Sequence, residues 1–145
     1  MAARERGLEF KVGVLIVIST VILLGRLSDP SLLPDEAVVS VITLAELSAG
    51  PHVARSSDER AARQAHLQQA ESDFDPIPFD TNAARAFGRV AAGLRAAGRK
   101  PAARAYDALI AATAIAEGLP LYTCNPDDFQ NMDELDVRHV PHPDS

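Results

Sequence analysis

The segment Tyr106–Phe129 reads YDALIAATAIAEGLPLYTCNPDDF and places a helix, a strand and an acid-rich turn in succession. Asp107 opens an apolar, alanine-rich run typical of a helix, and Gly118 and Pro120 end that run. The apolar strand Leu121–Thr123 follows and leads into the acidic turn. Because the carboxyl ends of strands and adjacent helix starts line the ligand crevice of an α/β sheet, carboxylates gathered there favour a hard divalent cation such as Mg²⁺ or Mn²⁺.

The composition is that of a globular protein. The chain has 145 residues, of which 47% are apolar and 23% charged, so one domain with a sizeable core is expected. A single Cys excludes an internal disulfide framework and a Cys-based zinc site, and it fits a reducing compartment such as the cytoplasm. Aromatic residues make up only 5% and Trp is absent, which argues against base-stacking platforms for single-stranded nucleic acid.

The charge is unevenly distributed. A net charge of −6 at first sight counts against a nucleic-acid-binding protein. From Thr81 to Tyr106, however, the chain has no acid and carries a series of cations that could contact RNA phosphates beside an acidic metal pocket. The alternative is a solvated helix face near the acids of a partner. The cations are Arg85, Arg89, Arg95, Arg99, Lys100 and Arg104.

The apolar segment Val12–Gly25 raises the question of a membrane anchor or signal peptide. It is shorter than the roughly 20 residues that span a bilayer. Glu5 and Glu9 dilute the basic residues that precede it, and no cleavage site follows Gly25. Its Val and Ile content instead favours a strand buried on both faces of a parallel sheet, which continues into a helix. We therefore expect no membrane association.

Strand and helix patterns alternate along the chain without a hairpin signal, which predicts an α/β fold with a parallel central sheet flanked by helices. The expected domain comprises residues 12–145, after a flexible N-terminal extension of residues 1–11. Gly98 is expected just beyond a helix end. Strands are predicted at 14–17, 37–41, 121–123 and 137–140, a short strand or extended piece at 77–80, and helices at 19–27, 42–49, 56–73, 82–97 and 107–117.

Each candidate ligand also has an ordinary structural explanation. Glu46 lies in an apolar stretch, where it is either a metal ligand or a residue on the exposed edge of an amphipathic helix. Asp107 is either a ligand or an acid favoured by the helix dipole. Asn125 and Asp128 are either ligands or turn residues. These residues follow separate strands, and one crevice would collect them, which favours the metal site.

The segments ITLAELSAG and YDALIAATAIAEGLPLYTCNPDDF resemble the PIN-domain ribonucleases, in particular the VapC-type toxins of bacterial toxin–antitoxin pairs. The resemblance covers nearly the whole chain. It implies a PIN-like α/β fold and a homodimer in the cytoplasm. It also implies Mg²⁺- or Mn²⁺-dependent endonucleolytic cleavage of RNA, and inhibition by a cognate VapB-like antitoxin.

The resemblance also assigns site residues. Glu46 matches the Glu of the T-x-x-E pattern, and Asp107 matches the Asp that begins the D-x-x-I-A-A-T-A helix. Asn125 and Asp128 match the polar and acidic positions of the T-x-N-x-x-D-F motif. The implied catalytic residues and metal ligands are thus Glu46, Asp107 and Asp128, with Asn125 as a further ligand. Cys124 replaces a basic residue common at its position.

The first strand departs from the family pattern, because Ile18 stands where an acid is expected before Ser19 and Thr20. An isoleucine offers no oxygen ligand, so the loss weakens the implied metal site. Two hypotheses follow. The chain is either a weakened but active ribonuclease, or a PIN-fold protein that has lost catalysis and only binds an antitoxin.

Overall fold

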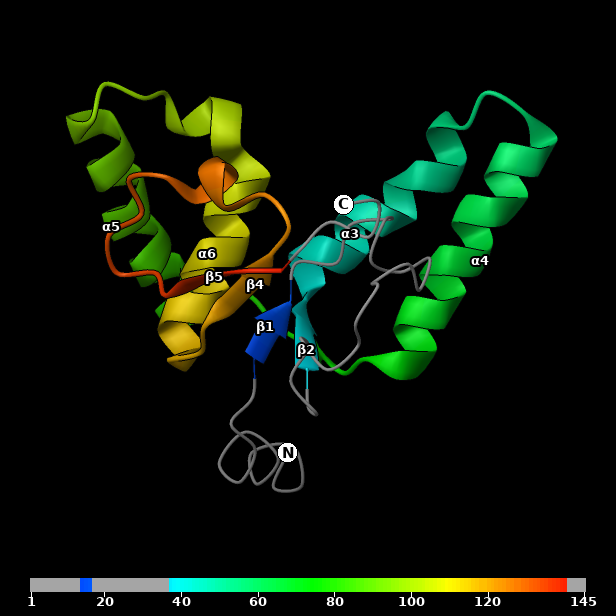
Figure 1. Cartoon of the computed structure of the whole chain (residues 1–145), viewed down its shortest axis with the longest axis horizontal. Coiled ribbons are helices and arrows are strands. Elements are labelled where there is room, and N and C mark those ends of the chain that lie inside the picture. The colour runs from blue at the N-terminus through cyan, green and yellow to red at the C-terminus, as the bar shows by residue number, and fades with distance from the viewer. Residues whose placement is uncertain (1–13, 17–36, 141–145) are drawn as a thin grey trace.

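The computed structural model describes residues 14–16 and 37–140, which form a parallel sheet with helices on both of its faces (Figure 1). The strand order is β3-β2-β1-β4-β5. The strands are β1 (Val14–Ile16), β2 (Ala37–Ser40), β3 (Pro76–Ile77), β4 (Leu121–Thr123) and β5 (Val137–His139). The helices are α3 (Val41–Ala49), α4 (Ser57–Asp73), α5 (Thr81–Ala96) and α6 (Ala105–Glu117), with short 3₁₀ turns η2 (Gly50–Val53), η3 (Pro101–Arg104) and η4 (Pro126–Phe129).

The predicted α/β class and parallel sheet are confirmed, and the strand at 121–123 has the expected bounds. The strand expected at 77–80 is wrong in length, since β3 ends at Ile77. Pro78 has no N–H for a sheet ladder, and the Asp80 side chain accepts a hydrogen bond from the Ala83 N–H at 2.9 Å. Asp80 is therefore already the cap of α5.

Several predictions fall on residues outside the described ranges. They are the extension at 1–11, the helix at 19–27 and the identity of Ile18 as a site position. Of the segment Val12–Gly25, the structure describes only β1. None of the helices within the described residues is both long and apolar enough to cross a membrane.

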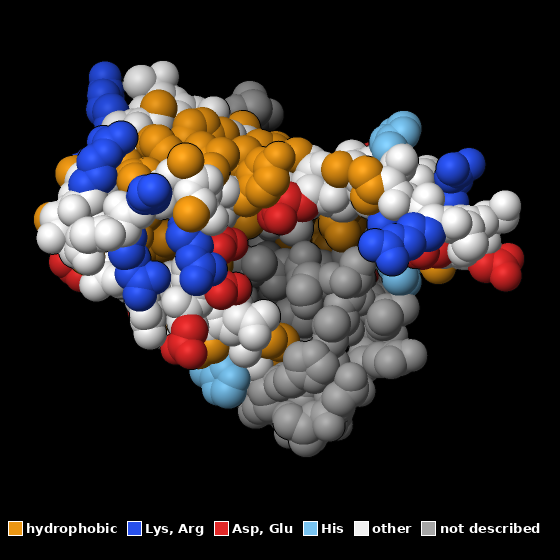
Figure 2. Space-filling view, turned by 90° about the horizontal axis from the view of Figure 1, so that it is seen from above, with side chains coloured by type: hydrophobic (Ala, Val, Ile, Leu, Met, Phe, Trp, Pro, Cys, Tyr) orange, Lys and Arg blue, Asp and Glu red, His pale blue; other side chains and the backbone are white. Residues whose placement is uncertain are grey.

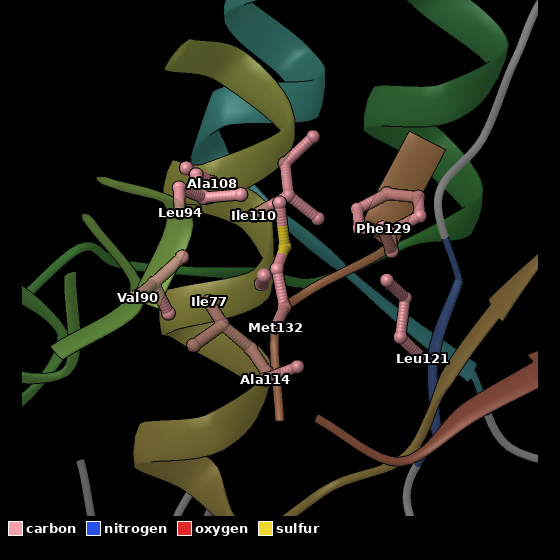
Figure 3. Close-up of a cluster of buried hydrophobic side chains, with 10 residues drawn as sticks. Ile77, Val90, Leu94, Ala108, Ile110, Ala114, Leu121, Phe129 and Met132 are labelled. Atoms are coloured by element: carbon pink, nitrogen blue, oxygen red, sulfur yellow. The ribbon is translucent and has the colours of Figure 1, made fainter. Parts of the chain in front are cut away.

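Side chains on β2 and β4 alternate between two cores, one on each face of the sheet. Val38 and Leu121 pack with α5 and α6, whereas Val39 and Tyr122 pack with α3 and α4. The larger core, shown in Figure 3, contains Ile77, Val90, Leu94, Ala108, Ile110, Ala111, Ala114, Leu121, Phe129 and Met132. This two-sided burial explains why the strands read as continuous apolar runs.

Two helices end in the same motif, with a glycine in the left-handed conformation just beyond the helix. Gly98 has φ +77° and Gly118 has φ +66°. After α6, the Gly118 N–H donates to the Ile115 carbonyl at 3.1 Å and the Leu119 N–H to the Ala114 carbonyl at 3.0 Å. This is the hydrogen-bond pattern of a Schellman motif. The predicted helix ends at these two glycines are confirmed.

We predict that Gly118→Ala lowers the free energy of unfolding by about 1–2 kcal/mol, because a Cβ is strained in the left-handed region. Gly88→Ala is the matched control. Gly88 lies inside α5, and a Cβ there meets nothing within 4 Å. This control is expected to raise the free energy of unfolding by about 0.5–1 kcal/mol. Urea unfolding of both variants measures the contrast, and equal effects would contradict the strain argument.

Candidate metal and phosphate site

The topology places several chain segments at the carboxyl end of the sheet. β1 pairs with β2 on one side and with β4 on the other, so the strand order reverses direction at β1. In open α/β sheets, ligands bind at the carboxyl ends of the strands beside such a switch point. The segments that follow β2 and β4 carry Glu46 and Asp128, respectively.

Glu46 is positioned by a strand that runs directly into a helix. Ser40 ends β2, and its hydroxyl oxygen accepts a hydrogen bond from the Ile42 N–H at 3.0 Å, which caps α3. Thr43 and Leu47 are the buried residues of α3, and Glu46 in the second turn is exposed. Its carboxyl is nevertheless crowded. Partial burial raises the pKa of Glu46, and the negative charge of Asp107 raises it further.

Asp107 lies in the first turn of α6, a helix anchored by fully buried Ala108, Ala111 and Ala112. Its side chain is 28% exposed. Partial burial raises the pKa of Asp107, and the charge of Asp128 adds to this increase, while Arg104 acts in the opposite direction. The net shift is upward. Like charge thus links Glu46 to Asp107 and Asp107 to Asp128.

Asp128 lies in η4, which buried Phe129 fastens to the larger core. Asn125 begins this turn and is exposed. The Asn125 N–H donates to the Thr123 hydroxyl at 3.0 Å, and the Asp128 N–H donates to the Asn125 carbonyl at 3.1 Å. These backbone bonds fix the path of the turn from β4, and they place Asn125 and Asp128 on the same short segment.

Arg104 differs from the other predicted RNA-binding cations, because it is directed at the acids. Its Nη1 donates to Oδ1 of Asp128 at 2.9 Å and lies 3.7 Å from Oδ2 of Asp107. From the sequence, Arg104 was predicted only to contact RNA phosphates. The three-residue spacing between Arg104 and Asp107 within a helical segment is the signal that could have indicated the ion pair.

The other cations extend over the half of the molecule that α5 and α6 form, where Lys and Arg side chains gather in Figure 2. Arg85, Arg95 and Lys100 are exposed. Arg89 forms an exposed ion pair with Glu134 at 2.8 Å, and the Arg99 Nη2 donates to Oε1 of Gln130 at 2.8 Å. The region is accordingly basic at the surface, although it includes acidic partners.

The donor types suit Mg²⁺ or Mn²⁺, since all three acids offer hard oxygen ligands and their charges are coupled. Their present arrangement is an open one. Within the ranges that the structure describes, no three His, Cys, Asp or Glu side chains are grouped closely enough to hold a metal ion. Instead, the Arg104 guanidinium lies at two of the three predicted ligands. The residues thus fit the cation in chemistry, with an arginine beside them.

Comparison with known proteins identifies the family of this chain. A model of the PIN domain family matches residues 20–135. The chain is 39% identical to ribonuclease VapC5 of Mycobacterium tuberculosis over 109 residues, which are 75% of this chain and 78% of the relative. It is 30% identical to ribonuclease VapC of Rickettsia bellii over 107 residues, 74% of this chain and 78% of that one.

The same relationship appears in three dimensions. The crystal structure of VapBC-5 from Mycobacterium tuberculosis, a member of the VapBC family of toxin–antitoxin systems, matches with a TM-score of 0.73 at 34% identity. The match covers 90% of this chain and 98% of that chain. The chain belongs to the VapC ribonucleases of the PIN-domain family. The resemblance inferred from the sequence motifs is confirmed. The match to the PIN domain model spans Glu46, Asp107 and Asp128 and begins after Ile18.

The raised pKa of Glu46 in this VapC chain predicts a pH-dependent gain of stability in Glu46→Gln. Because the folded-state pKa lies above the ordinary value of 4.5, the folded chain binds this proton more readily than the unfolded chain. The contribution of Glu46 to the free energy of unfolding is therefore highest at low pH, where its carboxyl group is protonated. It falls as the pH rises through the folded-state pKa of Glu46. Glu46→Gln is therefore expected to be more stable than the unmodified chain at pH 7 and equally stable well below pH 4.5.

Urea unfolding at several pH values checks this expectation. In an Asp107→Asn background the gain from Glu46→Gln should shrink, because one cause of the raised pKa has been removed. A Glu46→Gln chain that is less stable at pH 7 than the unmodified chain would show that the carboxylate has a favourable partner.

Proposed function

We propose that this chain is the toxin of a toxin–antitoxin pair and that it cleaves RNA endonucleolytically with Mg²⁺ or Mn²⁺. The observation that carries the proposal is the coupling of Glu46, Asp107 and Asp128 in a chain of the VapC family. A carboxyl group whose pKa is raised by a neighbouring acid, as for Glu46 beside Asp107 and for Asp107 beside Asp128, gains a favourable charge partner when a divalent cation binds.

In this proposal Glu46, Asp107 and Asp128 supply oxygen ligands, and Asn125 offers an amide oxygen from the same turn as Asp128. A divalent ion bound there would lower the pKa of a water molecule and neutralise charge that develops at phosphorus. The exposed cations Arg85, Arg95 and Lys100 would hold the RNA backbone through its phosphates. Arg89, Arg99 and Arg104 would add to the same basic field.

The proposed partners are a VapB-like antitoxin and a second copy of the chain, in the cytoplasm where RNA and the antitoxin are encountered. The matched VapBC-5 structure belongs to a toxin–antitoxin system, which supports the first partner. The single domain from residue 12 to 145 remains our proposal for the domain extent.

Ile18 favours a second candidate function. If the metal site needs an acid at that position, the chain is a PIN-fold protein that binds its antitoxin without cleaving RNA. Such a protein would form the complex but would not arrest growth when expressed. Growth arrest that depends on Glu46 would contradict this candidate.

We predict that the purified chain cleaves RNA in Mn²⁺ and that Asp107→Asn lowers the rate by about 100-fold or more. Loss of an outer-shell partner already costs 10- to 100-fold in metal affinity or activity, and a direct ligand contributes more. The assay measures fragments of a defined RNA and includes Ile18→Asp. If the Ile18→Asp variant cleaves RNA and the unmodified chain does not, the unmodified chain is an inactive toxin whose other site residues are in place.

Asp58→Asn is the matched control, because Asp58 is also an acid in the first turn of a helix, in this case α4. It is expected to leave the cleavage rate unchanged. If Asp107→Asn cleaves RNA as fast as Asp58→Asn does, the assigned site is wrong.

A further inference from the structure

Helix capping does not account for an arginine at position 104. Arg104 is the N-cap residue of α6 and makes no side-chain capping hydrogen bond. Ser, Thr, Asp and Asn are the residues that stabilise this position. A cation is also unfavourable at a helix N-terminus, where the helix dipole is positive. The local structure therefore argues for a different role of this side chain.

The contacts of Arg104 supply that role. Its guanidinium lies against Asp128 at 2.9 Å and Asp107 at 3.7 Å, and so joins the start of α6 to η4. The three side chains are partly exposed, at 36% for Arg104, 41% for Asp128 and 28% for Asp107. Water and ions can therefore reach the acids. The guanidinium, which stays charged at every physiological pH, places a positive charge where a bound cation would also be attracted.

We propose that Arg104 is an internal counter-cation that competes with the divalent metal ion for Asp107 and Asp128. This inference rests on the proposed metal site. A metal ion takes carboxylate oxygens at about 2.0–2.1 Å, and the Arg104 charge beside those oxygens repels it. The ion pairs therefore hold the acids together without metal and weaken the binding of metal.

The test is the affinity of the full chain for Mn²⁺ alone, measured by isothermal titration calorimetry. We expect Arg104→Gln to bind Mn²⁺ about two- to five-fold more tightly, the factor that an exposed ion pair is worth. Arg104→Lys keeps the charge without the planar fork and should bind with an affinity between the two. Arg138→Gln is the matched control, since Arg138 forms an exposed pair with Asp136 at 3.0 Å on β5. Its affinity should equal that of the unmodified chain.

Unchanged or weaker Mn²⁺ binding by folded Arg104→Gln would overturn the inference, because Arg104 would then only position the acids. The Asp107→Asn variant separates this result from failure of the proposed function. If the unmodified chain binds Mn²⁺ and Asp107→Asn binds no more weakly, the metal site itself is misplaced. If neither the unmodified chain nor Arg104→Gln binds Mn²⁺, both proposals fall.

A second measurement requires no variant and so avoids any effect on folding. In a ¹⁵N-labelled chain, the side-chain N–H signals of Arg104 report its hydrogen bond to Asp128. We expect titration with diamagnetic Mg²⁺ to shift these signals and to speed their exchange with water. If the backbone signals of Asp107 and Asp128 respond to Mg²⁺ while the Arg104 side chain does not, the two cations do not compete.

Discussion

Partial burial of Glu46 and Asp107 beside other acids is the constraint that the rest of this fold must overcome, because desolvation and like charge both raise the pKa of these two carboxyl groups. Complete burial of one large aliphatic side chain contributes about 1.5–3 kcal/mol. Several such side chains, among them Leu94, Ile110 and Leu121, fix the elements that carry the acids. The apolar cores therefore fix the backbone segments on which the acids lie.

The distance along the chain between interacting residues decides how much of the fold was predictable from the sequence. Leu121–Thr123, α6 and the glycine-terminated helix ends follow from local apolar runs and from the conformational freedom of glycine, which depend on neighbouring residues only. The strand expected at 77–80 was too long, because Asp80 accepts a hydrogen bond from the Ala83 N–H and so caps the next helix instead of continuing the strand. Local patterns thus predict where elements exist, while side-chain bonds to the next element decide where they end.

The candidate site divides in a similar way. Glu46 and Asp128 were predicted near one another because parallel strands bring their carboxyl ends to one edge of the sheet, whereas Asp107 follows η3 and not a strand. The contact of Arg104 with Asp128 spans 24 positions and depends on how η3 and η4 pack beside α6, which no local pattern encodes. An arginine in a basic stretch was therefore assigned to RNA alone. The structure gives it acidic partners within the protein.

In the proposed metal site, Ile18 and Arg104 shift the balance of charge in the same direction, against the binding of a metal ion. By the family resemblance, an acid at position 18 would add a ligand for the metal and also a further repulsive charge. On that proposal an isoleucine lacks both, which would disfavour metal binding. Arg104 stabilises the metal-free acids and repels the metal. With one carboxylate fewer to attract a cation, the single charge of Arg104 offsets a larger share of that attraction. Metal affinity in this chain should therefore be unusually sensitive to the position of one guanidinium.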